Sequence, residues 1–167
     1  MPLQLMVLIL GIGIFAVVAY GDIRTRRIPN EFIVAILGLA AFRIAIDGDP
    51  LAGLYTLAAA SALFVATFLL FWRGLLGGGD VKLIGATALL IGYHNFFEFL
   101  FVMSISGALV AVAVLARDRF GLRRATTPAQ EEQEVAEETR ARLTVPYGVA
   151  IAAAGIVVLL VQYLPTR

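Results

Sequence analysis

The chain has 167 residues, and its 13 basic and 12 acidic side chains leave a formal net charge of only +1. Hydrophobic residues make up 60% of it and charged residues 15%, whereas a soluble domain is about half apolar and a quarter charged. This composition excludes an ordinary soluble domain and a general nucleic-acid-binding surface. With no cysteine and one histidine, it also excludes disulfides, thiolate metal sites and histidine-rich metal sites.

Apolar stretches predict about six membrane-spanning helices. A helix needs about 20 mostly apolar residues to cross a bilayer. In chain order, the candidate stretches are residues 2–20, 31–46, 51–72, 81–93, 96–116 and 146–164. The first lacks the basic start of a secretory signal and is predicted to be a retained helix. We therefore predict an all-α, polytopic membrane protein with a single domain over residues 1–167.

The shortest stretch, residues 81–93, covers only about 20 Å of a hydrocarbon core near 30 Å thick. If its outer end reaches the far interface, its first residues lie below the headgroups of the near side. Alternatively, the helix stops short of the far side. The sequence is compatible with both arrangements.

Basic residues predict the orientation of the spans. They follow the first span, flank the third connection and recur in the fifth: Arg24, Arg26, Arg27, Arg73, Lys82, Arg117, Arg119, Arg123, Arg124, Arg140 and Arg142. Because alternate connections share one side, the positive-inside rule predicts that this side faces the cytoplasm. The polar segment at about residues 117–145 is then a cytoplasmic loop, whose basic start suits anionic lipid headgroups. Arg43, inside the second span near its outer end, is expected to snorkel to headgroups.

Two aspartates lie at the cytoplasmic ends of predicted spans, Asp22 after the first span and Asp80 before the fourth. A carboxylate beside hydrocarbon is costly and usually marks function. Two carboxylates within a few ångströms of each other share a proton. One can then activate water as a general base, while the other protonates the carbonyl oxygen and later the leaving amine. The pair therefore predicts peptide hydrolysis without a metal or another cofactor.

Each of these residues also has a structural explanation. Gly77, Gly78 and Gly79 either allow another backbone to approach closely or form a flexible turn, after which Asp80 only caps the fourth helix. Asp22 could be a counter-ion of the nearby arginines. Pro29 and Asn30 suit the start of the second helix. Lys82 either holds a substrate carboxylate, tunes the proton of the aspartates, or serves topology alone.

The motifs resemble those of the type IV prepilin peptidases, which are GxGD-type intramembrane aspartic proteases. In this family an aspartate precedes Ile-Pro-Asn by five residues, as Asp22 precedes Ile28, Pro29 and Asn30. Its Gly-x-Gly-Asp motif, with a lysine two residues on, is similar to the segment from Gly77 to Lys82. The segment that contains Pro146, Tyr147 and Gly148 is a third similar element.

The resemblance implies that Asp22 and Asp80 are the catalytic pair and that no metal takes part. It suggests substrate-binding or site-shaping roles for Gly77, Gly78, Gly79, Lys82, Pro29 and Asn30. The implied reaction removes the short basic leader of a prepilin or pseudopilin precursor at the cytoplasmic face of a prokaryotic cytoplasmic membrane. The partners are then the precursor peptide and membrane lipid, with no nucleic acid, and no oligomeric state is specified.

The chain also departs from part of the family. Longer members carry a four-cysteine zinc region between the first two spans and methylate the new N-terminus. This chain resembles the short form that accompanies tight-adherence (Flp) pili, and the related archaeal preflagellin peptidases. Methyl transfer is therefore not predicted.

Two other functions use similar features. Paired carboxylates and glycine-broken helices also serve proton-coupled small transporters. A non-catalytic pilus assembly subunit would need the aspartates only as helix caps. Against a transporter, the aspartates are predicted at one face rather than at the midplane, and the two halves of the chain do not repeat.

Overall fold

The computed structural model describes residues 2–119 and 147–163, which form a bundle of α-helices without a β-strand. The helices are α1 (Pro2–Thr25), α2 (Asn30–Asp47), α3 (Pro50–Trp72), α4 (Gly78–Ile91), α5 (Phe96–Arg119) and α7 (Tyr147–Tyr163), with a short 3-10 helix η1 (Tyr93–Asn95) between α4 and α5. They coincide with the six predicted spans, so the predicted all-α polytopic fold is confirmed. From residue 120 on, the predicted cytoplasmic loop lies outside the described residues.

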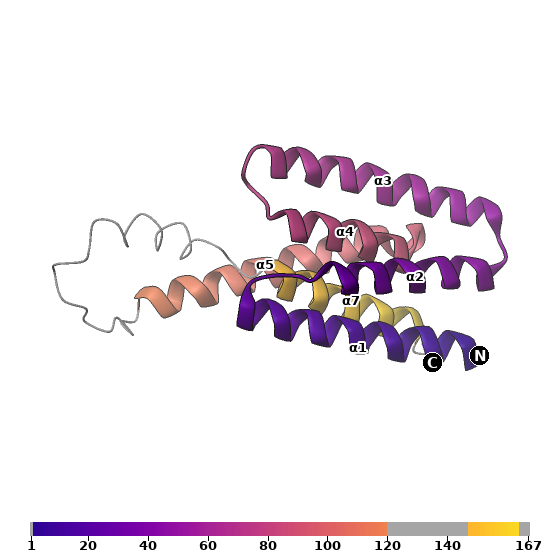
Figure 1. Ribbon diagram of the computed structural model, residues 1–167, viewed down its shortest axis with the longest axis horizontal. Helices are drawn as coiled ribbons and strands as arrows, with labels where there is room; N and C mark the ends of the chain where they lie inside the picture. Colours follow the sequence, from indigo (N-terminus) through magenta and orange to yellow (C-terminus); the bar gives the residue numbers. More distant parts are fainter. Residues whose placement is uncertain (1, 120–146, 164–167) are drawn as a thin grey trace.

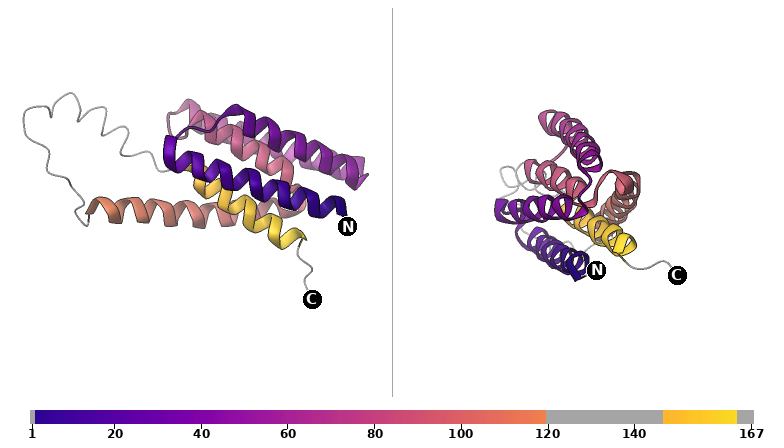
Figure 2. Two further views of the ribbon diagram at one scale, coloured as in Figure 1. Left: turned by 60° about the horizontal axis from the view of Figure 1, so that its bottom comes forward. Right: turned by 90° about the vertical axis from the view of Figure 1, so that its right-hand side faces the viewer.

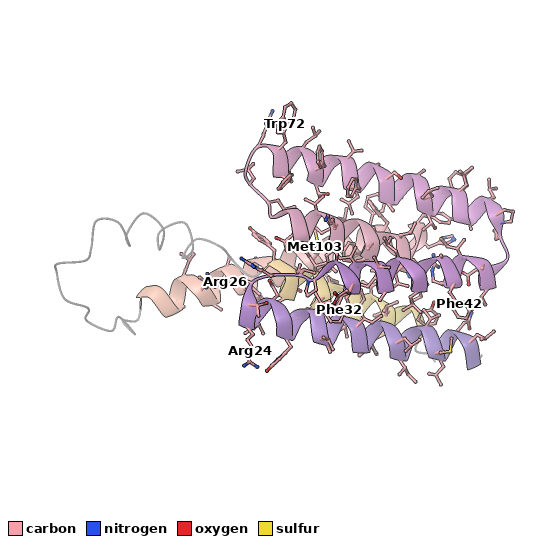
Figure 3. All side chains as sticks on the ribbon, viewed as in Figure 1. Arg24, Arg26, Phe32, Phe42, Trp72 and Met103 are labelled. Carbon is pink, nitrogen blue, oxygen red and sulfur yellow. The ribbon has the colours of Figure 1, made fainter. Side chains whose placement is uncertain are left out.

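The helices run up and down along one axis (Figure 1). The α1–α2 and α3–α4 connections lie at one end, and the α2–α3 connection and the N-terminus lie at the other. We call the first of these the loop end. Arg24, Arg26 and Trp72 lie at the loop end, and Phe42 lies toward the opposite end (Figure 3). Arg73 and Lys82 flank the α3–α4 connection, so the basic residues of the first and third connections share one end, as the alternation of the spans predicts.

The short helix α4 lies at the centre of the bundle, in contact with α2, α3, α5 and α7 (Figure 2). Its sequence is apolar on all sides except at its start, which is typical of a helix enclosed either by other helices or by lipid. In the structure other helices enclose it, and Leu83 and Leu90 are fully buried. By contrast, α3 packs mainly on α4 and exposes large apolar side chains such as Leu57 and Phe68. By length and composition, α1, α3 and the segment Tyr93–Ala116 can each cross a membrane.

Helix α4 stops short of the end opposite the loop end. Its first residue packs against Phe71 near the end of α3, and the backbone N–H of Tyr93 donates to Thr56 Oγ1 at 3.3 Å. Because Thr56 lies six residues after Pro50, α3 extends beyond α4 by about 9 Å. A cavity of about 170 Å³ occupies this level, lined in part by Asp49, Thr56 and His94. The structure thus favours the second arrangement that the sequence left open.

Arg43 points into the bundle rather than outward to headgroups. It is 8% exposed, and its Nη1 lies 3.1 Å from Asp47 Oδ2, one helical turn further on. A side chain at Gly92 would meet the guanidinium at 2.9 Å, so the bare backbone of Gly92 leaves room for it. The expectation of snorkelling was wrong because it rested on depth alone. The direction of the Arg43 side chain is set by Asp47 on the same helix and by the bare backbone of Gly92 between α4 and η1.

Candidate active site

Asp22 lies in the last turn of α1, because the helix continues to Thr25 and does not end at residue 20 as the apolar stretch does. The helix ends where Arg26 adopts the left-handed conformation, with φ of 51°, and donates its backbone N–H to the carbonyl of Asp22 at 3.0 Å. This is a common geometry of a helix C-terminus. The side chain of Asp22 is directed inward, and the residue is only 5% exposed. A nearly buried carboxylate therefore lies at the loop end.

The first turn of α7 covers the carboxylate of Asp22. The backbone N–H of Val149 donates to Asp22 Oδ2 at 3.2 Å, and the backbone of Gly148 also forms a hydrogen bond to this carboxylate. Gly148 is buried against it, and a Cβ on Gly148 would lie 2.7 Å from the same oxygen. The last helix of the chain therefore supplies the polar surroundings of an aspartate on the first helix.

Asp80 lies in the first turn of α4 and is half-buried. It accepts a hydrogen bond from the backbone of Gly77, the N-cap of α4, as a side chain at the third helical position does in a capping box. It is also close enough to Asp22 for the two charges to interact. Helix α7 packs against both α1 and α4. Two carboxylates that are far apart in the sequence thus lie at one end of the bundle, within range of each other's charge.

The three glycines before Asp80 provide room rather than unusual backbone conformations. The positive-φ glycines in the described residues are Gly48, Gly74 and Gly92, and Gly77 has an ordinary extended conformation. A Cβ on Gly77 would lie 2.7 Å from Asp80 Oδ2. On Gly78 it would lie 3.3 Å from the ring of Phe71, and on Gly79 it would lie 3.5 Å from Ile28. Of these three glycines, only Gly77 lacks a side chain where the carboxylate of Asp80 lies.

The remaining predicted residues join the two motifs. Lys82, which is exposed on α4, donates from Nζ to Asn30 Oδ1 at 3.1 Å. Asn30 is the first residue of α2, and Pro29 precedes it in an extended conformation without a side-chain cap. Asn30 therefore bonds to α4 instead of capping its own helix. Together with the contact of Gly79 on Ile28, this bond ties the α1–α2 connection to the start of α4.

Comparison with known proteins places these motifs in a family. The type IV leader peptidase family matches residues 9–112, a range that includes both aspartates. The chain belongs to this family. Across 123 residues it is 32% identical to the protein named "Prepilin leader peptidase/N-methyltransferase" of Bacillus subtilis (strain 168), a match that covers 72% of this chain and 49% of the relative. The chain thus spans about half the length of that relative, and no solved structure matches it.

Membership of the type IV leader peptidase family confirms the resemblance that the motifs indicate. Neither Gly148 nor Val149 was predicted at the site, although the segment around Gly148 is a third element similar to the family. The available signal was a glycine at the start of an otherwise apolar helix. From such a glycine one cannot predict which residue of another helix packs against it.

The described part of this leader peptidase family chain, residues 2–119 and 147–163, contains no group of three or more His, Cys, Asp or Glu side chains that could hold a metal ion. At the site itself stand two interacting carboxylates, backbone N–H groups and the charge of Arg26 near Asp22. Like charges that interact make it harder for both carboxylates to be ionised at once. One ionised and one protonated carboxyl group is the arrangement that general acid–base hydrolysis requires.

Proposed function

We propose that the protein is a membrane aspartic endopeptidase that removes the short basic leader of type IV prepilin-like precursors. The observation that carries the proposal is the placement of Asp22 and Asp80 at the loop end of the bundle, close enough for their charges to interact. Family membership supports the reaction class, and the name of the Bacillus subtilis relative supports the kind of substrate. By the positive-inside rule, the basic residues at the loop end support a location of this end at the cytoplasmic face of the membrane.

The proposed mechanism uses the proton that the two aspartates share. The ionised carboxylate takes a proton from water while the water oxygen attacks the carbonyl carbon of the scissile bond. The protonated carboxyl group gives its proton to the carbonyl oxygen, which produces a neutral tetrahedral intermediate. When the C–N bond breaks, the leaving amine takes a proton from the carboxyl group that accepted the proton of water. The other, now ionised, carboxylate takes back the proton of the hydroxyl group from which the carbonyl forms again. The pair then once more holds one proton.

The position of the site suits a substrate that is itself anchored in the membrane. A precursor whose apolar helix lies in the bilayer presents the bond just before that helix at the level of the headgroups. The site lies at an end of the bundle, where such a bond would arrive. The exposed apolar faces of α3 and α5 offer surfaces along which the substrate helix can lie. A proton-coupled transporter is less well supported, because its carboxylates are expected near the midplane.

A non-catalytic assembly subunit is the second candidate, and one observation favours it. Asp80 accepts a backbone hydrogen bond from Gly77, so the residue has a structural role whether or not it is catalytic. Asparagine can accept the same backbone hydrogen bond but cannot act as an acid or a base. The substitution Asp80→Asn therefore separates the two functions.

The test is leader removal from a synthetic prepilin by purified enzyme in detergent, with N-terminal sequencing of the product. We expect Asp22→Asn and Asp80→Asn each to lower the rate by at least about 100-fold, the usual contribution of a positioned acid or base. Asp49→Asn is the matched control, because Asp49 caps α3 through Leu51 and Ala52 at the opposite end. Wild-type rates in either site variant would remove that residue from the catalytic pair.

The pH dependence gives a further readout in the same assay. A pair that must hold one proton is inactive when both groups are protonated and when both are ionised. The rate of the wild-type enzyme should therefore rise and then fall with pH. A profile without the low-pH limb would contradict a carboxylate base.

A further inference from the structure

We propose that the first turn of α7 is a positioning element of the active site, in which Gly148 and the backbone N–H of Val149 hold the carboxylate of Asp22. This inference rests on the proposed function, since it concerns how the reactive carboxylate is kept in place. It assigns a role to the third sequence motif, which the acid–base mechanism by itself does not use.

The steric observation concerns the distance between Gly148 and Asp22. A Cβ on Gly148 would lie 2.7 Å from Oδ2, 2.8 Å from Cγ and 3.1 Å from Cβ of Asp22. Ordinary contacts begin at 3.4 Å. An alanine would therefore press on the whole side chain of Asp22 and not only on its flexible end. Either the carboxylate turns away or α1 and α7 separate by several tenths of an ångström.

The polar observation concerns the free backbone N–H groups at the start of α7. The first N–H groups of a helix have no partner within the helix. Val149 is the third residue of α7, and its N–H donates to Asp22 Oδ2 at 3.2 Å. The positive end of the helix dipole also favours a negative charge at this position. The backbone donors in the first turn of α7 thus favour the ionised form of Asp22, as does the positive charge of Arg26 at the end of α1.

The α1–α7 interface contains two other close glycine contacts, and these involve apolar side chains. A Cβ on Gly155 would lie 2.7 Å from the ring of Phe15, and a Cβ on Gly11 would lie 2.7 Å from Leu159. Small residues commonly allow helices in membranes to approach closely. Gly148 is distinct because the side chain that it accommodates is a carboxylate of the site. Gly155 is therefore a matched control for packing without a role in positioning Asp22.

The experiment compares Gly148→Ala with Gly155→Ala in the full-length enzyme, with cleavage rates measured across pH and thermal unfolding measured in detergent. For Gly148→Ala we expect kcat to fall by about 100-fold, the usual effect of displacing a reactive group by about 1 Å. The low-pH limb of its rate profile should also move to higher pH, because the ionised carboxylate loses its donor. Gly155→Ala should unfold at a lower temperature while its pH profile stays unchanged. Wild-type cleavage by Gly148→Ala, or an equal loss in both variants without a change in pH profile, would overturn the inference.

A second measurement on the wild-type protein covers the case in which Gly148→Ala does not fold. In protein labelled with ¹⁵N-valine, the amide resonance of Val149 should shift as Asp22 titrates, and this shift should disappear in Asp22→Asn. Val157, on the same helix, should not respond. A Val149 amide that does not respond would overturn the contact. If the wild-type enzyme cleaves no precursor, the proposed function fails while this measurement still tests the contact.

Discussion

Replacing Gly77 by alanine is expected to disable the enzyme while leaving the bundle almost intact. The new Cβ would lie 2.7 Å from Asp80 Oδ2, which is about 0.7 Å closer than ordinary contact allows. The backbone of Gly77, with φ of −76° and ψ of 143°, suits any residue, so it adds no strain. The atom that must move is the end of a flexible side chain, and that side chain carries the reactive carboxyl group.

The size of the effect follows from this displacement. Moving a reactive group by about 1 Å lowers catalysis by about 100-fold, which corresponds to about 2.7 kcal/mol in the activation free energy. Stability should fall by only about 1 kcal/mol, because alanine is a poorer N-cap than glycine. The assay is the initial rate of leader removal from a synthetic precursor, with thermal unfolding measured on the same detergent-purified samples.

The neighbouring glycine supplies the control. A Cβ on Gly79 would make an ordinary contact of 3.5 Å with Ile28, so Gly79→Ala should retain cleavage within about threefold of the wild-type rate, since alanine is tolerated where the backbone is compatible. If Gly79→Ala loses as much activity as Gly77→Ala, the glycines would serve the close approach of a substrate backbone. The reasoning that Gly77 makes room for Asp80 would then be refuted.

Two further predictions concern the contacts around the site and at the opposite end. Lys82→Met and Asn30→Ala remove the same exposed hydrogen bond, so a double-mutant cycle on unfolding should give a coupling below about 1 kcal/mol. An unchanged pH profile of cleavage in Lys82→Met would favour an anchoring role for this lysine, and a shifted profile would favour tuning of the aspartates. Gly92→Ala and Gly74→Ala both place a side chain at positive φ, but only a Cβ on Gly92 would meet the guanidinium of Arg43, at 2.9 Å. Gly92→Ala should therefore unfold at the lower temperature of the two, and equal unfolding temperatures would show that the contact with Arg43 is unimportant.

The sequence was sufficient to predict the six helical spans of residues 2–119 and 147–163, the connections that share one end and the placement of Asp22 and Asp80 at that end. These features depend on local properties. An apolar stretch of sufficient length becomes a helix in lipid, because its backbone groups must bond within the segment. Alternating spans then bring Arg24 and Arg73 to the same end. The spacing of the motifs around Asp22 and Asp80 required no knowledge of packing.

The tertiary structure decided which helices touch. In the structure α7 packs against Asp22 and Arg43 points into the bundle. Helix α4 stops short of the end of the bundle opposite the aspartates. The sequence could not predict these features, because a helix in lipid is apolar both where it packs and where it is exposed, so no amphipathic pattern marks the packed side. Close packing at small residues such as Gly148 and Gly155 determines which helices contact each other. A glycine in the sequence does not specify which side chain will occupy the space that it leaves.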